Sequence, residues 1–285
     1  MILYKKAADL QHYLRKQKSA GQGLGFIPTM GALHQGHLSL IEAAKMHHGR
    51  VVCSIFVNPT QFNDPGDFQK YPLSIEKDIC LLEKKGTDVL FLPEIEEIYT
   101  EGTANLEQYP LGYLDTILEG KFRPGHFQGV CQVMRRLLLL AEPDRLYMGQ
   151  KDYQQGMVVR ILLQLMGSKT ELFLCPTERE PDGLAMSSRN MRLDPSQRKK
   201  ALAIFDALAY LKKNLQPGNL SLLIQQASGI LIKNDFKIDY VAIADQYSLE
   251  PIEEWNGKQK IVALVAAFQD QIRLIDNLVL NDEPN

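Results

Sequence analysis

The first two-thirds of the chain alternate short apolar runs with longer segments of helical periodicity. The periodic segments predict helices around 38–48, 74–85, 128–141 and 153–166. Such alternation favours a parallel sheet whose two faces are both covered by helices. We therefore predict an α/β fold with a Rossmann-like parallel sheet, whose strands are Leu24–Thr29, Val51–Val57, Val89–Leu92, Arg145–Met148 and Glu171–Cys175.

The character of the sequence changes after Arg192. Asp194 and Pro195 suit the N-cap and first position of a helix, and the periodic stretch runs to about Asn214. A second helix is expected over 220–234, and the last two of three further strands are expected to pair: Asp239–Ala244, Lys260–Phe268 and Gln271–Leu280. The prediction is a domain over 1–183 followed by a smaller α+β lid domain over 184–285.

Composition excludes several classes of protein. A net charge of −2 argues against general binding of nucleic acid, which leaves a basic footprint. No apolar run approaches the roughly 20 residues that span a membrane, and the first residues lack the regions of a signal peptide. The 4 cysteines form no C-x-x-C pair, so we expect reduced thiols in a cytoplasmic protein without nucleic-acid or membrane partners.

The segment Pro28–His37 predicts a strand that runs into a glycine-marked turn, with His34 and His37 where the next helix begins. Free N–H groups at a helix start, small residues and imidazole donors together suit a phosphate chain. A zinc site at the two histidines is an alternative, but no cysteine or second histidine pair has ligand spacing nearby.

Three more polar segments follow predicted strands, and a fourth lies at a helix entrance. Asp182–Asn190 combines hydroxyls with an arginine and suits a phosphate clamp, although an ordinary polar loop explains it too. Lys151, beyond a strand, could meet phosphate or be an exposed turn lysine. Asn58–Asn63 offers amides or a plain turn, and Arg123–Phe127 carries two potential cations. Ligands of doubly wound sheets collect at strand ends, which favours a shared function.

In their order along residues 26–190, five segments closely resemble motifs of the pantoate–β-alanine ligase (pantothenate synthetase) family. They are Pro28–His37, Ser54–Phe62, Arg123–Val130, Gly149–Gln155 and Asp182–Asn190. An H-x-G-H motif alone would indicate only the wider nucleotidyltransferase superfamily. The resemblance implies ATP-dependent condensation of (R)-pantoate with β-alanine through pantoyl adenylate. The products are pantothenate, AMP and pyrophosphate, in the pathway to coenzyme A.

The resemblance also implies roles for individual residues. His34, His37, Lys151 and Arg189 are expected to be catalytic, with His37 the leading proton donor and Lys151 neutralising charge at the α-phosphate. ATP is expected to contact Met30, Gly31, Ala32, Leu33, His34, Gln35, Gly36, His37, Gly149, Gln150, Lys151, Asp152, Glu178, Met186, Ser187, Ser188 and Arg189. Pantoate and β-alanine are expected at Gln61, Gln155, Pro28, Met30, Asn58, Val130 and Val133, with Phe56 adding to the apolar wall.

The same resemblance implies Mg²⁺ with ATP, and a homodimer. Asp78 matches a family position near the metal, although a solvated helical carboxylate is the equally simple interpretation. Many relatives have glutamate at the position of Gln150 and an apolar residue at that of Glu178. If these positions meet the nucleotide through the backbone, side-chain identity matters little there.

Other functions remain as alternatives. An adenylyltransferase for another small carboxylic acid would keep the histidine and serine–arginine segments but change the surroundings of Gln61 and Gln155. A tRNA synthetase is disfavoured because the chain has no basic excess. In a non-catalytic nucleotide-binding protein we would expect the phosphate-facing residues to be replaced. Here His34, His37, Lys151 and Arg189 are all present.

Overall fold

Two units of structure make up the chain in the computed structural model, which describes residues 1–63, 65–69 and 71–281. The first unit comprises Met1–Gln150 and Gln154–Pro176, and the second comprises Lys151–Tyr153 and the chain from Thr177 onward. The second unit thus begins before the predicted boundary at 183. A short bridge between Arg179 and Ala185 explains this difference, because Arg179 also pairs with Asp276 at 2.6 Å within the second unit.

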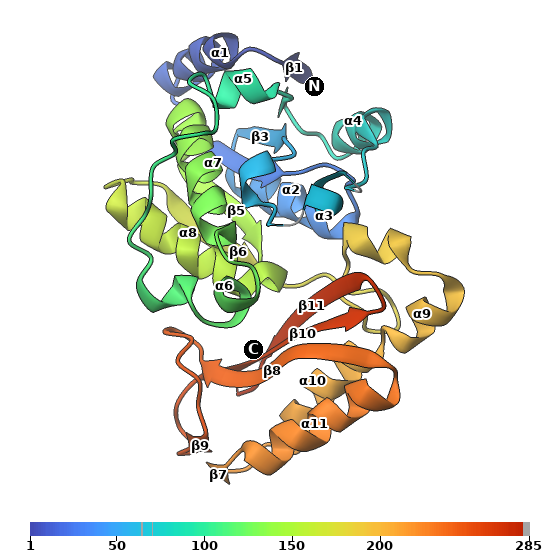
Figure 1. Ribbon diagram of the computed structural model, residues 1–285. Coiled ribbons are helices and arrows are strands. Elements are labelled where there is room, and N and C mark those ends of the chain that lie inside the picture. Colours follow the sequence, from blue (N-terminus) through green and yellow to red (C-terminus); the bar gives the residue numbers. More distant parts are fainter. Residues whose placement is uncertain (64, 70, 282–285) are drawn as a thin grey trace. The chain divides into compact units, whose positions relative to one another are not determined.

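The first unit contains a six-stranded parallel sheet with the order β1-β4-β3-β2-β5-β6 (Figure 1). Its strands are β1 (Ile2–Tyr4), β2 (Leu24–Thr29), β3 (Arg50–Ile55), β4 (Val89–Phe91), β5 (Arg145–Gly149) and β6 (Glu171–Cys175). All five predicted strands are present with small shifts at their ends. The edge strand β1 was not predicted, because it has only 3 residues and its side chains are largely exposed.

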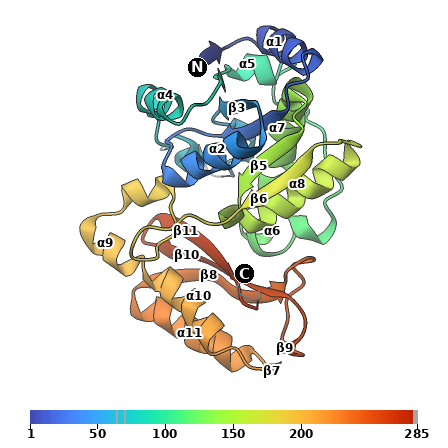
Figure 2. The same cartoon turned by 180° about the vertical axis from the view of Figure 1, so that it is seen from behind.

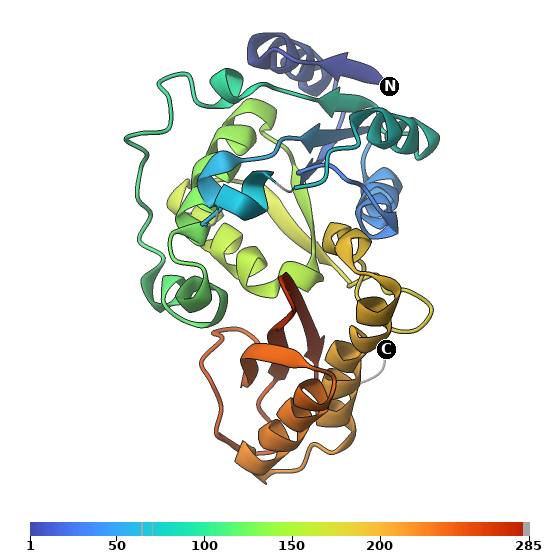
Figure 3. The same cartoon turned by 45° about the vertical axis from the view of Figure 1, so that its right-hand side comes forward.

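Helices cover both faces of this sheet, as the α/β prediction requires. Helices α2 and α7 lie on opposite faces (Figure 3), and α1 packs beside α7. The helices are α1 (Ala7–Ser19), α2 (Gln35–His47), α3 (Pro65–Gln69), α4 (Ile75–Lys84), α5 (Ile95–Ile98), α6 (Leu118–Phe122), α7 (His126–Ala141) and α8 (Tyr153–Leu165). Short 3-10 turns join them at η1 (Pro59–Gln61), η2 (Gly112–Asp115) and η3 (Gln150–Asp152).

The core of the first unit forms between the sheet and its helices. Ile27, Val51, Cys53 and Leu90 of the strands and Ile41 of α2 have no exposed surface. Strands of a parallel sheet are buried on both faces, which is why they read as continuous apolar runs. Each fully buried aliphatic side chain contributes about 1.5–3 kcal/mol, so this layer fixes the ends of the strands in place.

The second unit is an antiparallel sheet packed on helices, visible from behind in Figure 2. The sheet has the order β11-β10-β8, and β10 and β11 pair as predicted. Its elements are η4 (Ser188–Arg192), α9 (Pro195–Lys200), α10 (Ala203–Lys213), β7 (Gly218–Asn219), α11 (Ser221–Lys233), β8 (Phe236–Asp245), β9 (Glu254–Trp255), β10 (Ile261–Gln269) and β11 (Ile272–Val279).

The helix predicted from Asp194 begins where expected. The Asp194 carboxylate accepts hydrogen bonds from the N–H groups of Ser196 and Gln197, which satisfies donors at the helix start. The expected single helix to Asn214 is wrong in one respect, because it divides into α9 and α10. The Leu202 N–H is bonded to the Lys199 carbonyl, three residues back, so the backbone tightens into a 3-10 turn there. No helix in the described part of the chain has the length and apolar character to cross a membrane.

Candidate active site

The turn between β2 and α2 contains two consecutive residues with left-handed backbone conformation. Gly31 and Ala32 have φ angles of 85° and 49°, both in the left-handed region. A Cβ at Gly31 would lie 3.1 Å from the Ile55 side chain and 3.2 Å from an Asp78 oxygen. Left-handed backbone costs about 1–2 kcal/mol for a residue with a side chain, so Ala32 needs compensation from its surroundings. Together with Pro28 and Met30, these residues form the segment predicted to hold ATP and pantoate.

Asp78 supplies that compensation from α4. Its fully buried carboxylate accepts a hydrogen bond from the Ala32 N–H at one oxygen and from the Leu33 N–H at the other, both at 2.8 Å. The Ser74 hydroxyl donates to the same carboxylate at 3.0 Å. These bonds link α4 to the turn and fix its left-handed backbone.

The structure gives Asp78 a role in holding the turn, and its predicted place near a metal stays a prediction. The described residues contain no group of three or more His, Cys, Asp or Glu side chains that could hold a metal ion. The zinc alternative at His34 and His37 gains no support either.

The two histidines have a defined arrangement at the start of α2. His34 Nδ1 accepts from the Gly36 N–H at 3.2 Å, and His37 Nδ1 accepts from the His34 N–H at 3.3 Å. A backbone N–H can only donate, so neither Nδ1 carries a proton and each ring is neutral with its proton on Nε2. The ring centroids are 4.1 Å apart. The helix start, including Gln35, thus combines an electropositive N-terminus with two Nε2–H donors.

The histidine turn lies at the switch point of the sheet. Strands β3 and β4 follow on one side of β2, whereas β5 and β6 lie on its other side. Ligand sites of doubly wound sheets form beyond the carboxyl ends of the strands at this point. Gly149 ends β5, which pairs directly with β2, and Gln150 follows it. Two segments predicted to bind ATP therefore leave neighbouring strands at the same edge.

The amide residues after β3 form one buried network. Asn58, 1% exposed, donates through Nδ2 to Gln61 Oε1 and to the Gly129 carbonyl, each at 3.1 Å, while its oxygen accepts from the Tyr99 hydroxyl at 2.7 Å. Gln61 in turn places its Nε2 3.2 Å from the Met30 sulfur. The structure thus brings Gln61 to the histidine turn, and Asn58 anchors the amide.

The second predicted phosphate segment lies in the second unit and is held by local bonds. Ser187 Oγ accepts from the Arg189 N–H at 3.2 Å, and the Asn190 side chain donates to the Ala185 carbonyl at 3.0 Å. The Met186 N–H donates to the Glu178 carbonyl at 2.9 Å. Glu178 therefore joins this loop through its backbone, and Ser188 is buried within it.

Comparison with known proteins decides the family. The family model for pantoate-beta-alanine ligase matches residues 2–279. The pantothenate synthetase of Cytophaga hutchinsonii is 42% identical over 283 residues, covering 98% of this chain and 99% of that protein. The chain belongs to the pantoate–β-alanine ligase family.

Solved structures of the family agree over the whole length. The pantothenate synthetase of Thermus thermophilus matches with a TM-score of 0.91 at 42% identity, covering 99% of this chain and 100% of that one. The pantoate-beta-alanine ligase of Francisella tularensis, solved in complex with beta-gamma ATP and beta-alanine, matches with a TM-score of 0.83 at 35% identity, covering 100% of both chains. The predicted family, fold class and ligase function are confirmed.

The backbone of Lys151 is held by residues far along the chain, in the second unit. Lys151, Asp152 and Tyr153 belong to the second unit although residues on both sides of them belong to the first. The Asn277 side chain of β11 donates to the Lys151 carbonyl at 2.8 Å, and the Tyr153 hydroxyl donates to the Gln246 carbonyl at 2.8 Å. The segment thus leaves β5 with its backbone fixed by β11.

Gln154, the neighbour of the predicted ligand Gln155, has a structural role that the sequence did not indicate. Gln154 is buried, and its amide donates to the carbonyls of Leu114 and Ile117 while accepting from the Glu119 N–H. It therefore ties α8 to the segment around α6. Gln155, half-buried in the first turn of α8, remains the predicted pantoate ligand. Nothing local in the sequence separates the two glutamines.

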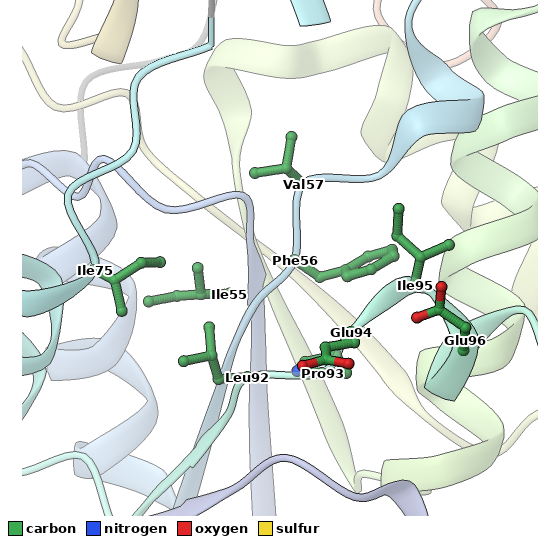
Figure 4. A pocket seen from close by; sticks show the side chains of 9 residues that line it. All are labelled: Ile55, Phe56, Val57, Ile75, Leu92, Pro93, Glu94, Ile95 and Glu96. Carbon is green, nitrogen blue, oxygen red and sulfur yellow. The ribbon is translucent and has the colours of Figure 1, made fainter. Parts of the chain in front are cut away.

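An apolar cavity of about 390 Å³ lies beyond the ends of β3 and β4 (Figure 4). Its lining residues are Ile55, Phe56, Val57, Ile75, Leu92, Pro93, Glu94, Ile95 and Glu96. Phe56, expected in the apolar wall for pantoate, lines this cavity next to Ile95 (Figure 4). The histidines and glutamines of the predicted site do not line it. Val130 and Val133 are instead buried on α7, the helix that contacts η1.

Proposed function

We propose that this ligase works in two half-reactions with ATP as the activating substrate. A carboxylate oxygen of pantoate attacks the α-phosphorus of ATP. The bond from the α-phosphorus to the oxygen that bridges the α- and β-phosphates breaks, and pyrophosphate leaves. The amine of β-alanine then attacks the carbonyl carbon of pantoyl adenylate, loses a proton and expels AMP. The observation that carries this proposal is the full-length family match together with a histidine turn at the switch point of the sheet.

The histidine turn is suited to receive the phosphates. His34 and His37 offer Nε2–H donors, and the N-terminus of α2 adds partial positive charge. Because both rings are neutral, we assign them hydrogen bonding to phosphoryl oxygens. His37 then acts as a donor to developing charge, which is a smaller demand than full proton transfer.

We assign the remaining charge stabilisation to Lys151 and to the serine–arginine segment. Lys151 neutralises charge at the α-phosphate, and Ser187, Ser188 and Arg189 bind the β- and γ-phosphates. Gly149, Gln150, Asp152, Glu178 and Met186 complete the ATP contacts through their backbone or side chains. This catalysis is positioning and electrostatic stabilisation, with no covalent enzyme intermediate.

Pantoate selection is assigned to Gln61 and Gln155, which pair with its hydroxyl and carboxylate oxygens. Pro28, Met30, Val130 and Val133 supply apolar surface for the gem-dimethyl group, and Asn58 orients Gln61. A site that hydrogen-bonds these oxygens rejects acids that lack them, because its own polar atoms would remain unpaired.

Mg²⁺, a homodimer and a cytoplasmic location complete the proposal as implied by the family. Bound with ATP, Mg²⁺ would offset the negative charge of the phosphates. The described residues offer no cluster of ligands for the ion, and Asp78 is committed to the turn, so no step is assigned to it.

Exchange of labelled pyrophosphate into ATP tests the first half-reaction. The proposal predicts exchange that depends on pantoate and does not need β-alanine. Exchange with another small carboxylic acid, and none with pantoate, would show that the chain activates a different acid.

The variant Lys151→Ala tests the role of the lysine. We expect pyrophosphate exchange to slow by about 10²–10³-fold, as for the loss of one preorganised donor at developing charge. Pantoate binding should change little. Lys169→Ala, at an exposed lysine, is the matched control. An unchanged exchange rate in the Lys151 variant would remove it from the mechanism.

A further inference from the structure

The first turn of α7 is seated directly on η1, which carries Gln61. A Cβ placed at Gly129 would lie 2.3 Å from the Thr60 carbonyl oxygen and 2.6 Å from the Gln61 Cα. Only glycine permits this approach of helix to turn. The Gly129 carbonyl accepts from Asn58, the residue that also donates to the Gln61 side chain. The backbone of α7 therefore sets the place of η1.

His126, one turn earlier on the same helix, contacts the backbone of Gln61. It is 5% exposed, and its Nδ1 lies 2.8 Å from the Gln61 carbonyl oxygen. Its Nε2 lies 3.1 Å from Nη1 of Arg123, whose guanidinium is 3.7 Å from the Glu119 carboxylate. A line of polar groups thus runs from α6 to η1, with Glu119 and His126 buried and Arg123 half-buried.

The chemistry of these groups fixes the proton on the ring. A guanidinium can only donate, so His126 Nε2 accepts and carries no proton. The Gln61 carbonyl can only accept, so the proton of the neutral ring is on Nδ1 and is donated to that carbonyl. Hydrogen bonds are therefore donated from Arg123 to His126 and from His126 to Gln61. The His126 ring carries its proton on Nδ1, whereas the rings of His34 and His37 carry theirs on Nε2.

We propose that Arg123 and His126 are positioning residues that set the pantoate specificity of Gln61. His126 holds the Gln61 carbonyl from α7 and Arg123 orients the His126 ring, while Asn58 holds the Gln61 side-chain oxygen, so the amide nitrogen is aimed toward Met30. Neither residue touches substrate in this role. The inference rests on the proposed function of Gln61 as a pantoate ligand.

The first test compares His126→Leu with His126→Asn. The asparagine amide can still donate to the Gln61 carbonyl from near the position of Nδ1, whereas leucine leaves that carbonyl unpaired. We expect His126→Leu to raise the KM for pantoate about tenfold, the effect of losing one buried hydrogen bond, with the KM for ATP unchanged. His126→Asn should recover most of this loss.

Gln132→Leu is the matched control, because Gln132 is on the same helix, is equally buried and also donates to a backbone carbonyl, that of Glu107. It should lower stability without changing the KM for pantoate. Equal effects of His126→Leu and His126→Asn on pantoate, or an equal effect of Gln132→Leu, would overturn the inference.

The second test needs no variant at His126. Nitrogen-15 NMR of the 6 histidines should show one neutral ring with its proton on Nδ1, and Arg123→Met should change that signal. A proton on Nε2 of His126 in the wild-type protein would refute the inference even if His126→Leu does not fold. Gln61→Ala distinguishes the positioning role of His126 from the proposed function of Gln61. An unchanged KM for pantoate in this variant would refute the assigned role of Gln61 itself.

Discussion

The histidine turn and the serine–arginine loop are both predicted to bind phosphate, yet they are built differently. In the turn, left-handed backbone is held by a buried carboxylate from a helix far along the chain. In the loop, Ser187 and Asn190 bond within a few residues of themselves. Long-range bonds give a site that is preformed, whereas local bonds allow a segment to adjust at low cost. The histidine turn is thus suited to orient ATP in a fixed position, and the serine–arginine loop is suited to adjust its conformation to the bound nucleotide.

The largest expected effect is that of Asp78→Ala, which would break the rigid side of this comparison. Two buried backbone N–H groups lose their acceptor, so we expect unfolding free energy to fall by about 2–5 kcal/mol and exchange to be nearly abolished. Denaturant unfolding and pyrophosphate exchange measure these changes. Glu76→Ala, at an exposed carboxylate on the same helix, should be neutral. Recovery of activity with excess Mg²⁺ would contradict the turn-holding role and favour a metal role.

The next effect is that of Arg189→Ala on the loop side. We expect exchange to slow about 100-fold, because a forked donor to phosphate is lost, while the unfolding free energy falls by less than in Asp78→Ala. Arg189→Lys should recover part of the rate, since it keeps the charge without the fork. Arg192→Ala, in the same short helix, is the control. A stability loss as large as that of Asp78→Ala would show that the loop is as rigid as the turn.

A smaller effect is expected for Asn277→Leu, which releases the backbone of Lys151. Exchange should slow about five- to tenfold, because the lysine is less well placed, and the KM for pantoate should not change. Asn234→Leu removes a comparable amide-to-carbonyl bond at the end of α11 and serves as the control. Equal rates in the two variants would show that the Lys151 carbonyl needs no anchor.

Thiol reactivity gives the finest measure of rigidity around the turn. Burial raises the pKa of the Cys53 thiol to about 12, and Cys53 lies in β3 beside the strand that leads to the turn. Cys80 is exposed. In the wild-type protein we expect a thiol reagent to modify Cys80 rapidly and Cys53 only after opening. In Asp78→Ala the rate at Cys53 should rise about tenfold; an unchanged rate would mean that Asp78 does not limit opening there.

The sequence predicted those elements whose formation depends on neighbouring residues alone. Apolar runs located β2 to β6, and Asp194 before Pro195 located the start of α9. Spacing cannot reveal partners that only folding brings together. The bonds of Asp78 to the turn span 46 and 45 residues, and the bond of Asn277 to Lys151 spans 126. For that reason neither the bonds of Asp78 to the turn nor the contacts of Arg123 and His126 were foreseen.

The chain passes between the two units three times, after Gln150, after Tyr153 and after Pro176. A single cut at residue 177 would therefore not yield two complete folding units, because the C-terminal fragment would lack Lys151–Tyr153 and Asn277 would lose its acceptor. Chimeras between relatives that exchange only the C-terminal part would pair β11 of one parent with the lysine segment of the other. Recombination within this fold should succeed best when both pieces are inherited together.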